Sequence, residues 1–235
     1  MSAMRDIPVI FEDDEILIIN KPAGAAVQGG KGIAHPLDDE LSRQTGLRIH
    51  LVHRLDKETC GLMVVAKNPA AARKWTDLIS SKAVRKEYTA VCFNEPALGG
   101  IKRRTGTISG NVVTGSGKNQ RERSAVTNFT VEEVMTARVP PLEDGGTDVA
   151  LTFSRIRVRL GTGRTHQIRI HLASVGSPVC GDDRHGDFRL NRLTRKRLGI
   201  RNLLLCSSRL AIPSRGGEER VFEIEPPGCF SLPLL

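Results

Sequence analysis

The sequence has few aromatic residues, few cysteines and no long apolar run. Aromatic residues occupy 4% of its 235 positions, with one tryptophan and one tyrosine. The five cysteines are odd in number and none form a C-x-x-C pair, which predicts reduced, mostly buried thiols rather than a disulfide framework or a zinc knuckle. No stretch approaches the ~20 apolar residues that span a bilayer, and the N-terminus has no apolar core of a secretory signal. We therefore expect a cytoplasmic protein outside the membrane.

Acidic residues are also fewer than basic ones: the sequence has 26 Asp and Glu and 35 Lys and Arg, which gives a net charge of +9. This excess favours a polyanionic partner, and RNA or DNA fits better than an acidic metabolite. The G-x-x-x-x-G-K-[ST] and G-x-S-x-G motifs of nucleotide binding and serine hydrolysis are missing. His166 and His171 are five residues apart, which turns them about 140° on a helix, whereas zinc-chelating helices use a spacing of four. The sequence predicts no metal site.

Apolar residues, 39% of the chain, fall mainly into short segments typical of strands. The segment 149–160 changes its alternation near Ser154 and Arg155, which indicates a bulge. Residues 103–123 are rich in glycine and positive charge and predict a hairpin tip and loop, and 138–147 predict a loop. Further strands are expected at 15–20, 62–66, 86–93, 125–131, 203–212 and 221–224.

Two helices are predicted from capping residues and periodicity. Asn68 is expected to cap a helix with Pro69 as its first residue, which continues to about Lys82. Thr165 is expected to cap a second, in which Ile168, Leu172 and Val175 share one face. Many strands with few helices predict an α+β fold, a single domain over 1–235 with its core from about 9 to 227. Its large mixed, mainly antiparallel sheet would be flanked by helices and loops.

Two polar segments are out of place for simple core packing. The first, 53–61, carries a histidine and four charges directly before an apolar strand, and the second, 163–171, enters a helix after a glycine-broken turn. Asp56 of the first would resist ionising if buried, and a guanidinium beside it would restore its charge. Arg169, on the polar side of the second helix, is the candidate partner. An ordinary structural ion pair is the alternative.

These two segments carry a resemblance to a known family. HRLDKETCG (53–61), followed by LMVVAKN, resembles the H-R-L-D-x-x-T-[SC]-G-[LV] motif of the RluA-type pseudouridine synthases, and GRTHQIRIHLASVGSPVCGDDRHG (163–186) resembles their second signature. NKPAG (20–24) and KEY (86–88) fit the remaining landmarks, so that the resemblance runs from about Val9 to Pro227. It looks closest to bacterial synthases of large-subunit (23S) ribosomal RNA. Their S4-type domain is expected to be absent, because nothing of its size precedes Val9.

The resemblance implies isomerisation of uridine to pseudouridine in RNA, without a redox cofactor, ATP or a metal. It implies that Asp56 is the catalytic aspartate, which attacks the ribose or the base or acts as a base on the sugar. Arg169 matches the residue that keeps this aspartate ionised, and Tyr88 matches the aromatic that stacks on the uracil and could help remove the C5 proton. Arg54 matches the residue that fills the space of the flipped base. Cys60, where serine is commoner, and His185, where tyrosine is commoner, depart from the pattern.

RNA contacts are expected from the basic surface, with Arg164 as a further phosphate contact. The 184–201 segment could instead be a solvated amphipathic helix with Leu190, Leu193 and Leu198 packed down, which is compatible with RNA contact from its other face. We expect a monomer. Three alternatives stay open: transfer RNA as the substrate, a catalytically silent RNA-binding or assembly protein, and a metal-dependent nuclease. The predicted surface contacts are Arg103, Arg104, Lys118, Arg121, Arg123, Arg195, Lys196 and Arg197.

Overall fold

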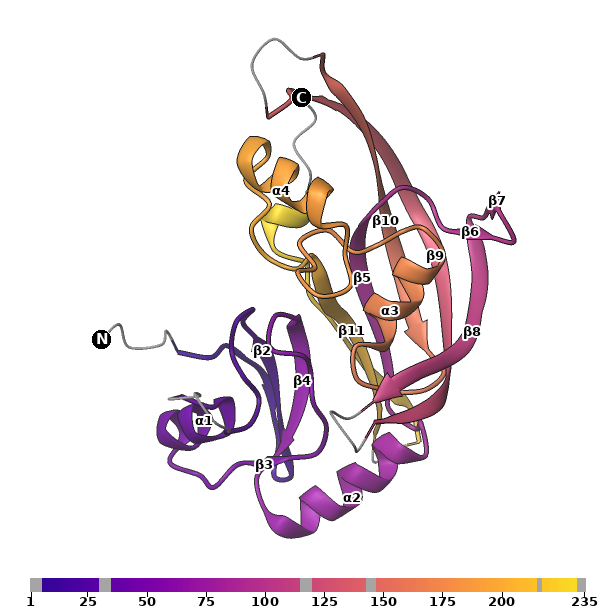
Figure 1. Ribbon diagram of the computed structural model, residues 1–235. Coiled ribbons are helices and arrows are strands. Elements are labelled where there is room, and N and C mark those ends of the chain that lie inside the picture. The colour runs from indigo at the N-terminus through magenta and orange to yellow at the C-terminus, as the bar shows by residue number, and fades with distance from the viewer. Residues whose placement is uncertain (1–5, 30–34, 115–119, 143–146, 215–216, 232–235) are drawn as a thin grey trace. The chain divides into compact units, whose positions relative to one another are not determined.

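The computed structural model describes residues 6–29, 35–114, 120–142, 147–214 and 217–231 (Figure 1). The chain forms two compact units. Unit 1 comprises residues 1–86 and 206–225, and unit 2 comprises residues 87–205 and 226–235. The chain thus leaves unit 1 in the fifth strand and returns to it in the eleventh.

Unit 1 is built on a mixed sheet with the order β1-β2-β4-β11, in which β3 also pairs with β4 and β12 with β11. The β4–β11 ladder is parallel, with Cys60 opposite Cys206. Every residue of β4 is buried, which is typical of a central strand. The strands are β1 (Val9–Glu12), β2 (Ile16–Lys21), β3 (His50–Leu51), β4 (Cys60–Ala66), β11 (Leu205–Pro213) and β12 (Glu219–Glu223).

Helix α2 (Pro69–Ser80) closes the main core of unit 1. The Asn68 side chain accepts a hydrogen bond from the amide of Ala71, so the predicted cap is confirmed. Ala71 and Trp75, one turn apart, pack against the apolar side chains of β2, β4 and β11. A second helix of the unit, α1 (Leu37–Thr45), buries Leu37 and Leu41 and ends at Gly46 in the left-handed conformation.

Unit 2 carries an antiparallel meander with the order β5-β10-β9-β8. β9 and β10 are long and curve together in Figure 1. The β9–β10 register shifts between Arg155 and Ile156, which confirms the predicted bulge, although the extra residue lies on β9 at Glu132. The strands are β5 (Arg85–Phe93), β6 (Ala97–Leu98), β7 (Ile101–Lys102), β8 (Thr105–Thr114), β9 (Arg121–Val139) and β10 (Val149–Leu160), with β6 and β7 as a separate small hairpin.

The helices of unit 2 follow the meander. They are α3 (Gln167–Ser174), α4 (Phe188–Arg197) and the short 3-10 helix η2 (Gly228–Phe230). Ile168 and Leu172 of α3 are buried, as predicted, but the residue that precedes the helix is His166 rather than Thr165. His166 has a φ of 54° and no side-chain capping bond.

Two predicted loops are partly strands. Residues 105–114 and 121–123 form a regular β8–β9 ladder, and β9 continues through Val139 into the segment expected to be a loop. Most residues of β8 and of the first part of β9 are polar or exposed. The alternation of apolar and polar residues that predicts a strand is therefore missing from this part of the sequence. The α+β class and the mixed, mainly antiparallel pairing are confirmed.

All five cysteines lie in the described residues, and four of them are buried, as predicted. None of the helices in the described ranges is both long and apolar enough to cross a lipid bilayer.

Candidate active site

Asp56 lies in unit 1, in the loop that joins β3 to β4. The loop is fixed through its main chain. The ammonium of Lys21, at the end of β2, has no exposed surface and donates hydrogen bonds to the carbonyl oxygens of Pro22, Lys57 and Thr59 at 3.0, 2.8 and 2.8 Å. The Thr59 amide closes a turn by donating to the carbonyl of Asp56 at 3.1 Å. Lys21 therefore holds the carbonyls on the C-terminal side of Asp56 in place.

Burial disfavours the charged form of Lys21 and lowers its pKa to about 8, although Cys60, Glu58 and Asp56 act in the opposite direction. Cys60 is buried at the start of β4, and a hydrogen bond with the side chain of Cys206 lowers the pKa of its thiol. Next to it Gly61 has a φ of 106°, and an added Cβ would lie 2.4 Å from the Ser207 carbonyl oxygen. The strand that follows Asp56 thus approaches β11 so closely that only glycine fits.

His53, at the head of the Asp56 loop, is a structural residue. Its Nε2 accepts a hydrogen bond from the amide of Val64 at 3.1 Å. Burial, together with the positive charge of Lys86, lowers the pKa of His53 well below its ordinary value. A neutral imidazole that accepts from the backbone of β4 ties the loop to the strand.

Arg169 lies in unit 2, and its partner there is Asp182. The Arg169 Nε donates to Asp182 Oδ2 at 2.8 Å and its Nη2 to Oδ1 at 2.6 Å, a bidentate pair of 7% and 1% exposed residues. The side of α3 that was expected to be polar is therefore buried, which corrects that prediction. Burial raises the pKa of Asp182, but the hydrogen bonds from Arg169 and from the amides of His185 and Arg184 outweigh it and lower the pKa.

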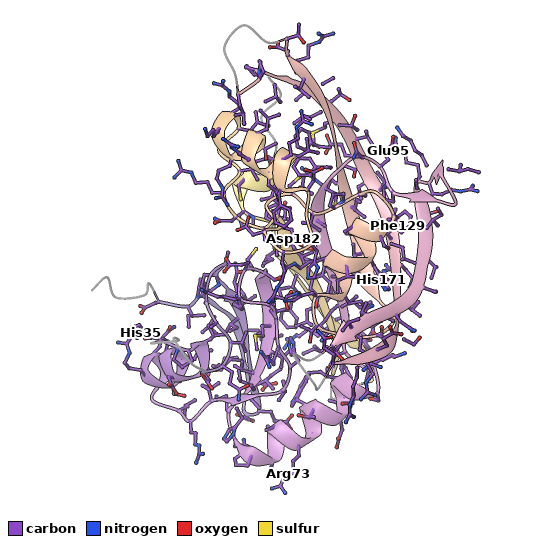
Figure 2. The ribbon with its side chains drawn as sticks, viewed as in Figure 1. His35, Arg73, Glu95, Phe129, His171 and Asp182 are labelled. Carbon is purple, nitrogen blue, oxygen red and sulfur yellow. The ribbon has the colours of Figure 1, made fainter. Side chains whose placement is uncertain are left out.

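The turn that carries Asp182 is built by glycines. Figure 2 labels Asp182, which lies between α3 and α4. A Cβ at Gly181 would lie 2.0 Å from the carbonyl oxygen of Asn202, and one at Gly186 would lie 2.4 Å from that of Asp182. The Asn191 side chain bridges the turn, accepting from the Gly181 amide at 2.8 Å and donating to the Asp182 carbonyl at 2.9 Å. The G-D-D-R-H-G sequence therefore serves to place one carboxylate beside Arg169.

Gln167 and His171 fix α3 against β9. The Gln167 amide nitrogen donates to the carbonyl of Val126 and to the hydroxyl of Thr127, both at 2.9 Å, and its oxygen accepts from the Thr162 hydroxyl at 2.7 Å. The His171 Nδ1 lies 2.9 Å from the same Thr127 hydroxyl, and burial lowers the pKa of this histidine. The helix that carries Arg169 is thus anchored on both sides of that residue.

Tyr88 lies on β5 of unit 2, opposite Val158 of β10, and is 5% exposed. Its neighbour Glu87 pairs with Arg159 of β10 at 2.8 Å. Asp56 belongs to unit 1 and Tyr88 and Arg169 to unit 2, so the pairing of Arg169 with Asp56 and the stacking role of Tyr88 stay predictions.

The predicted RNA contacts that the structure describes are all exposed. Arg121 and Arg123 lie on β9 and not in a loop, which corrects that expectation, and Lys118 lies outside the described residues. Arg195 faces Asp183 at 3.4 Å, and Arg197 donates to the carbonyl of Pro141. Among the described residues no three His, Cys, Asp or Glu side chains gather as a metal site requires. The exposed residues are Arg54, Arg103, Arg104, Arg121, Arg123, Arg164, Arg195, Lys196 and Arg197.

Sequence reasoning missed the roles of Lys21 and Asp182. A lysine at the end of an apolar strand, directly before a turn with proline and glycine at 22–24, gave a signal, because lysine is rarely buried without partners. Asp182 gave a weaker one, a carboxylate between two glycines, whose partner is thirteen residues away.

Comparison with known proteins gives the family. Residues 15–174, which contain Asp56, Tyr88 and Arg169, match the family model described as RNA pseudouridylate synthase. The chain belongs to the RNA pseudouridylate synthase family. The predicted resemblance is thereby confirmed.

Relatives within this family are close enough to align over most of the chain. The ribosomal large subunit pseudouridine synthase C of Escherichia coli K12 is 32% identical over 235 residues, which cover 97% of this chain and 68% of the relative. The protein of the same name from Rickettsia prowazekii is 33% identical over 192 residues, which cover 76% of this chain and 56% of the relative.

Two solved structures share the pseudouridylate synthase fold. The human RNA pseudouridylate synthase domain containing 1 superposes with a TM-score of 0.72 at 22% identity, covering 99% of this chain and 89% of that one. The human domain containing 4 gives a TM-score of 0.69 at 24% identity, covering 95% and 90%.

Proposed function

We propose that this protein isomerises uridine to pseudouridine in large-subunit ribosomal RNA, with Asp56, Tyr88 and Arg169 as catalytic residues. The observation that carries the proposal is the family match over residues 15–174, in which all three are present. The names of the Escherichia coli and Rickettsia relatives support ribosomal RNA as the substrate. Transfer RNA is the alternative within the same chemistry.

The proposed reaction breaks the N1–C1′ glycosidic bond and joins C5 of the uracil to C1′. The proton on C5 is lost and N1 gains one, so that the product is an isomer. Asp56 supplies the carboxylate, as a nucleophile or as a base on the sugar, and the Lys21 anchor holds its loop. Arg169 keeps this carboxylate ionised, and Asp182 fixes the direction in which the guanidinium points. The guanidinium has five N–H donors, so a clamp by Asp182 is compatible with a second carboxylate.

The uridine must leave its stack to reach these groups, at a cost of a few kcal/mol. Arg54 is proposed to occupy the vacated space, because a guanidinium both stacks on bases and binds phosphate. It is exposed at the head of the Asp56 loop, which supports that role. We further propose a cytoplasmic monomer, and the spread of the exposed large apolar side chains over several segments supports the monomer.

The test is to map pseudouridine chemically, nucleotide by nucleotide, in RNA from a strain that lacks this gene. We expect at least one pseudouridine to disappear from large-subunit ribosomal RNA and to return with the wild-type gene but not with Asp56→Asn. Loss of pseudouridine from transfer RNA alone would show that transfer RNA is the substrate. An unchanged map would contradict the proposed activity and favour a catalytically silent RNA-binding protein. RNA cleavage that stops with EDTA would favour the nuclease.

A further inference from the structure

Helix α4 of unit 2 (orange in Figure 1) presents an exposed face that combines four cations with an aromatic ring. Phe188, the first residue of α4, is 64% exposed, the highest value among the large apolar side chains of the described residues. The cations are Arg189, Arg192, Arg195 and Lys196, all exposed. We call these five residues the α4 face.

The α4 face is continuous. At 100° per residue its five positions fall within about 120° of the helix circumference, and from first to last they rise about 12 Å. Asn191, Leu193 and Thr194 occupy the remaining arc and are buried, so the helix is anchored through its opposite side. Arg197 lies outside the face and donates to the carbonyl of Pro141. The face therefore has a fixed orientation.

Of the two acidic residues next to the α4 face, one caps the helix and the other pairs with a cation of the face. Asp187 caps the helix, accepting from the amide of Leu190 at 2.9 Å. Asp183 lies 3.4 Å from Arg195 and is largely exposed. No acidic residue lies within α4 itself, so the charge of the face is strongly positive.

We propose that the α4 face binds an unpaired segment of the RNA substrate, with Phe188 stacked on a base and the cations on the flanking phosphates. The inference rests on the proposed function only for the identity of the RNA. Phosphate contacts alone were expected from the sequence, and the exposed ring adds recognition of an unstacked base. An aromatic ring between cations is the arrangement by which proteins bind single-stranded RNA, since each base offers a π-face and each nucleotide a phosphate.

Other partners fit the α4 face less well. A single phenylalanine on a ten-residue helix provides little apolar area for a lipid surface, where amphipathic helices insert a whole apolar face. A protein partner would need an acidic surface with an apolar centre, and in that case leucine would replace the ring without loss. Replacement of Phe188 by leucine therefore distinguishes RNA from a protein partner.

The experiment measures binding of the full chain to an unstructured single-stranded RNA oligonucleotide by fluorescence anisotropy at several salt concentrations. We expect Phe188→Leu to raise Kd fivefold or more with an unchanged salt slope, because it loses stacking and no charge. Phe188→Trp should bind like the wild type. Replacing Arg189, Arg192 and Lys196 together by glutamine should reduce the slope of log K against log salt by about 2, since each single-strand phosphate contact contributes about 0.7.

The matched control is Arg73→Gln, a single exposed charge on α2 that Figure 2 labels, and we expect its Kd to stay within twofold of the wild type. Wild-type affinity of Phe188→Leu, or an unchanged salt slope in the triple variant, would overturn the proposal. Thermal unfolding confirms that each variant folds. If the wild type makes no pseudouridine while these binding losses occur, the proposed function fails and the α4 face stands. If it makes pseudouridine and the losses do not occur, only the α4 face fails.

Discussion

The two units hold their functional side chains in opposite ways. In unit 2 two buried side chains of opposite charge clamp each other, and the net effect of the surroundings lowers the pKa of Asp182, so the fold favours its charged form. In unit 1 a buried ammonium binds main-chain carbonyls, and burial lowers the pKa of Lys21 to about 8, so the fold disfavours its charged form. The clamp contributes stability, whereas the anchor of the Asp56 loop mainly fixes a conformation.

This difference predicts a larger stability loss in unit 2. Asp182→Asn keeps the shape and can still accept hydrogen bonds, but it removes the carboxylate charge that binds the buried Arg169 guanidinium through two hydrogen bonds. We expect the free energy of unfolding at pH 7 to fall by about 3 kcal/mol, measured by urea titration. A loss below 1 kcal/mol would contradict the clamp.

The pH dependence of this loss identifies its cause. Because the folded pKa of Asp182 lies below its unfolded value of about 3.9, the stability it contributes is present above that pH and is lost as the pH falls through the folded pKa. The gap between the wild type and Asp182→Asn should therefore narrow below about pH 4. A gap that stays constant there would assign the loss to packing instead of charge.

Lys21→Met should have the smaller effect on stability and a clear effect on activity. Methionine fills the same space but leaves three carbonyls without their donor, while the cost of burying an ammonium disappears. We expect a net loss of about 2 kcal/mol, since the two changes partly offset. The Asp56 loop loses its anchor, so kcat should fall at least tenfold in variants that remain folded.

The lowered pKa of Lys21 also predicts how stability changes with pH. The unfolded state keeps the proton of Lys21 to about pH 10.5 and the folded state loses it near pH 8, so wild-type stability rises between these values relative to Lys21→Met. A difference that falls as the pH rises would contradict a desolvated ammonium.

The buried strands of unit 1 and the start of its helix α2 could be predicted from the sequence. β2 and β4 are short apolar runs, and Asn68 with Pro69 marks the start of α2 through local chemistry alone. The residues of the candidate site came from the resemblance, because a catalytic aspartate in a loop has no periodicity.

The rest depends on contacts that are distant in the sequence. Arg169 is buried because Asp182, on a glycine-built turn after α3, neutralises it, and nothing in the helix pattern indicates that turn. Arg121 and Arg123 form a strand because β8 pairs with them, although their own composition is that of a loop. Thr165 does not cap α3, because the helix begins at Gln167 after His166 and the Gln167 amide donates to the carbonyl of Arg164.

The most direct test of the central claim is tritium release from RNA labelled at C5 of uridine, with the wild type compared with Asp56→Asn. Asparagine keeps the shape of the side chain and removes its charge, so nucleophile and base are lost together. We predict release by the wild type and background for Asp56→Asn, with RNA affinity changed by less than tenfold because the expected grip lies on the basic surface. Release by Asp56→Asn at the wild-type rate would contradict the assignment of Asp56, and no release by the wild type from ribosomal or transfer RNA would contradict the enzyme.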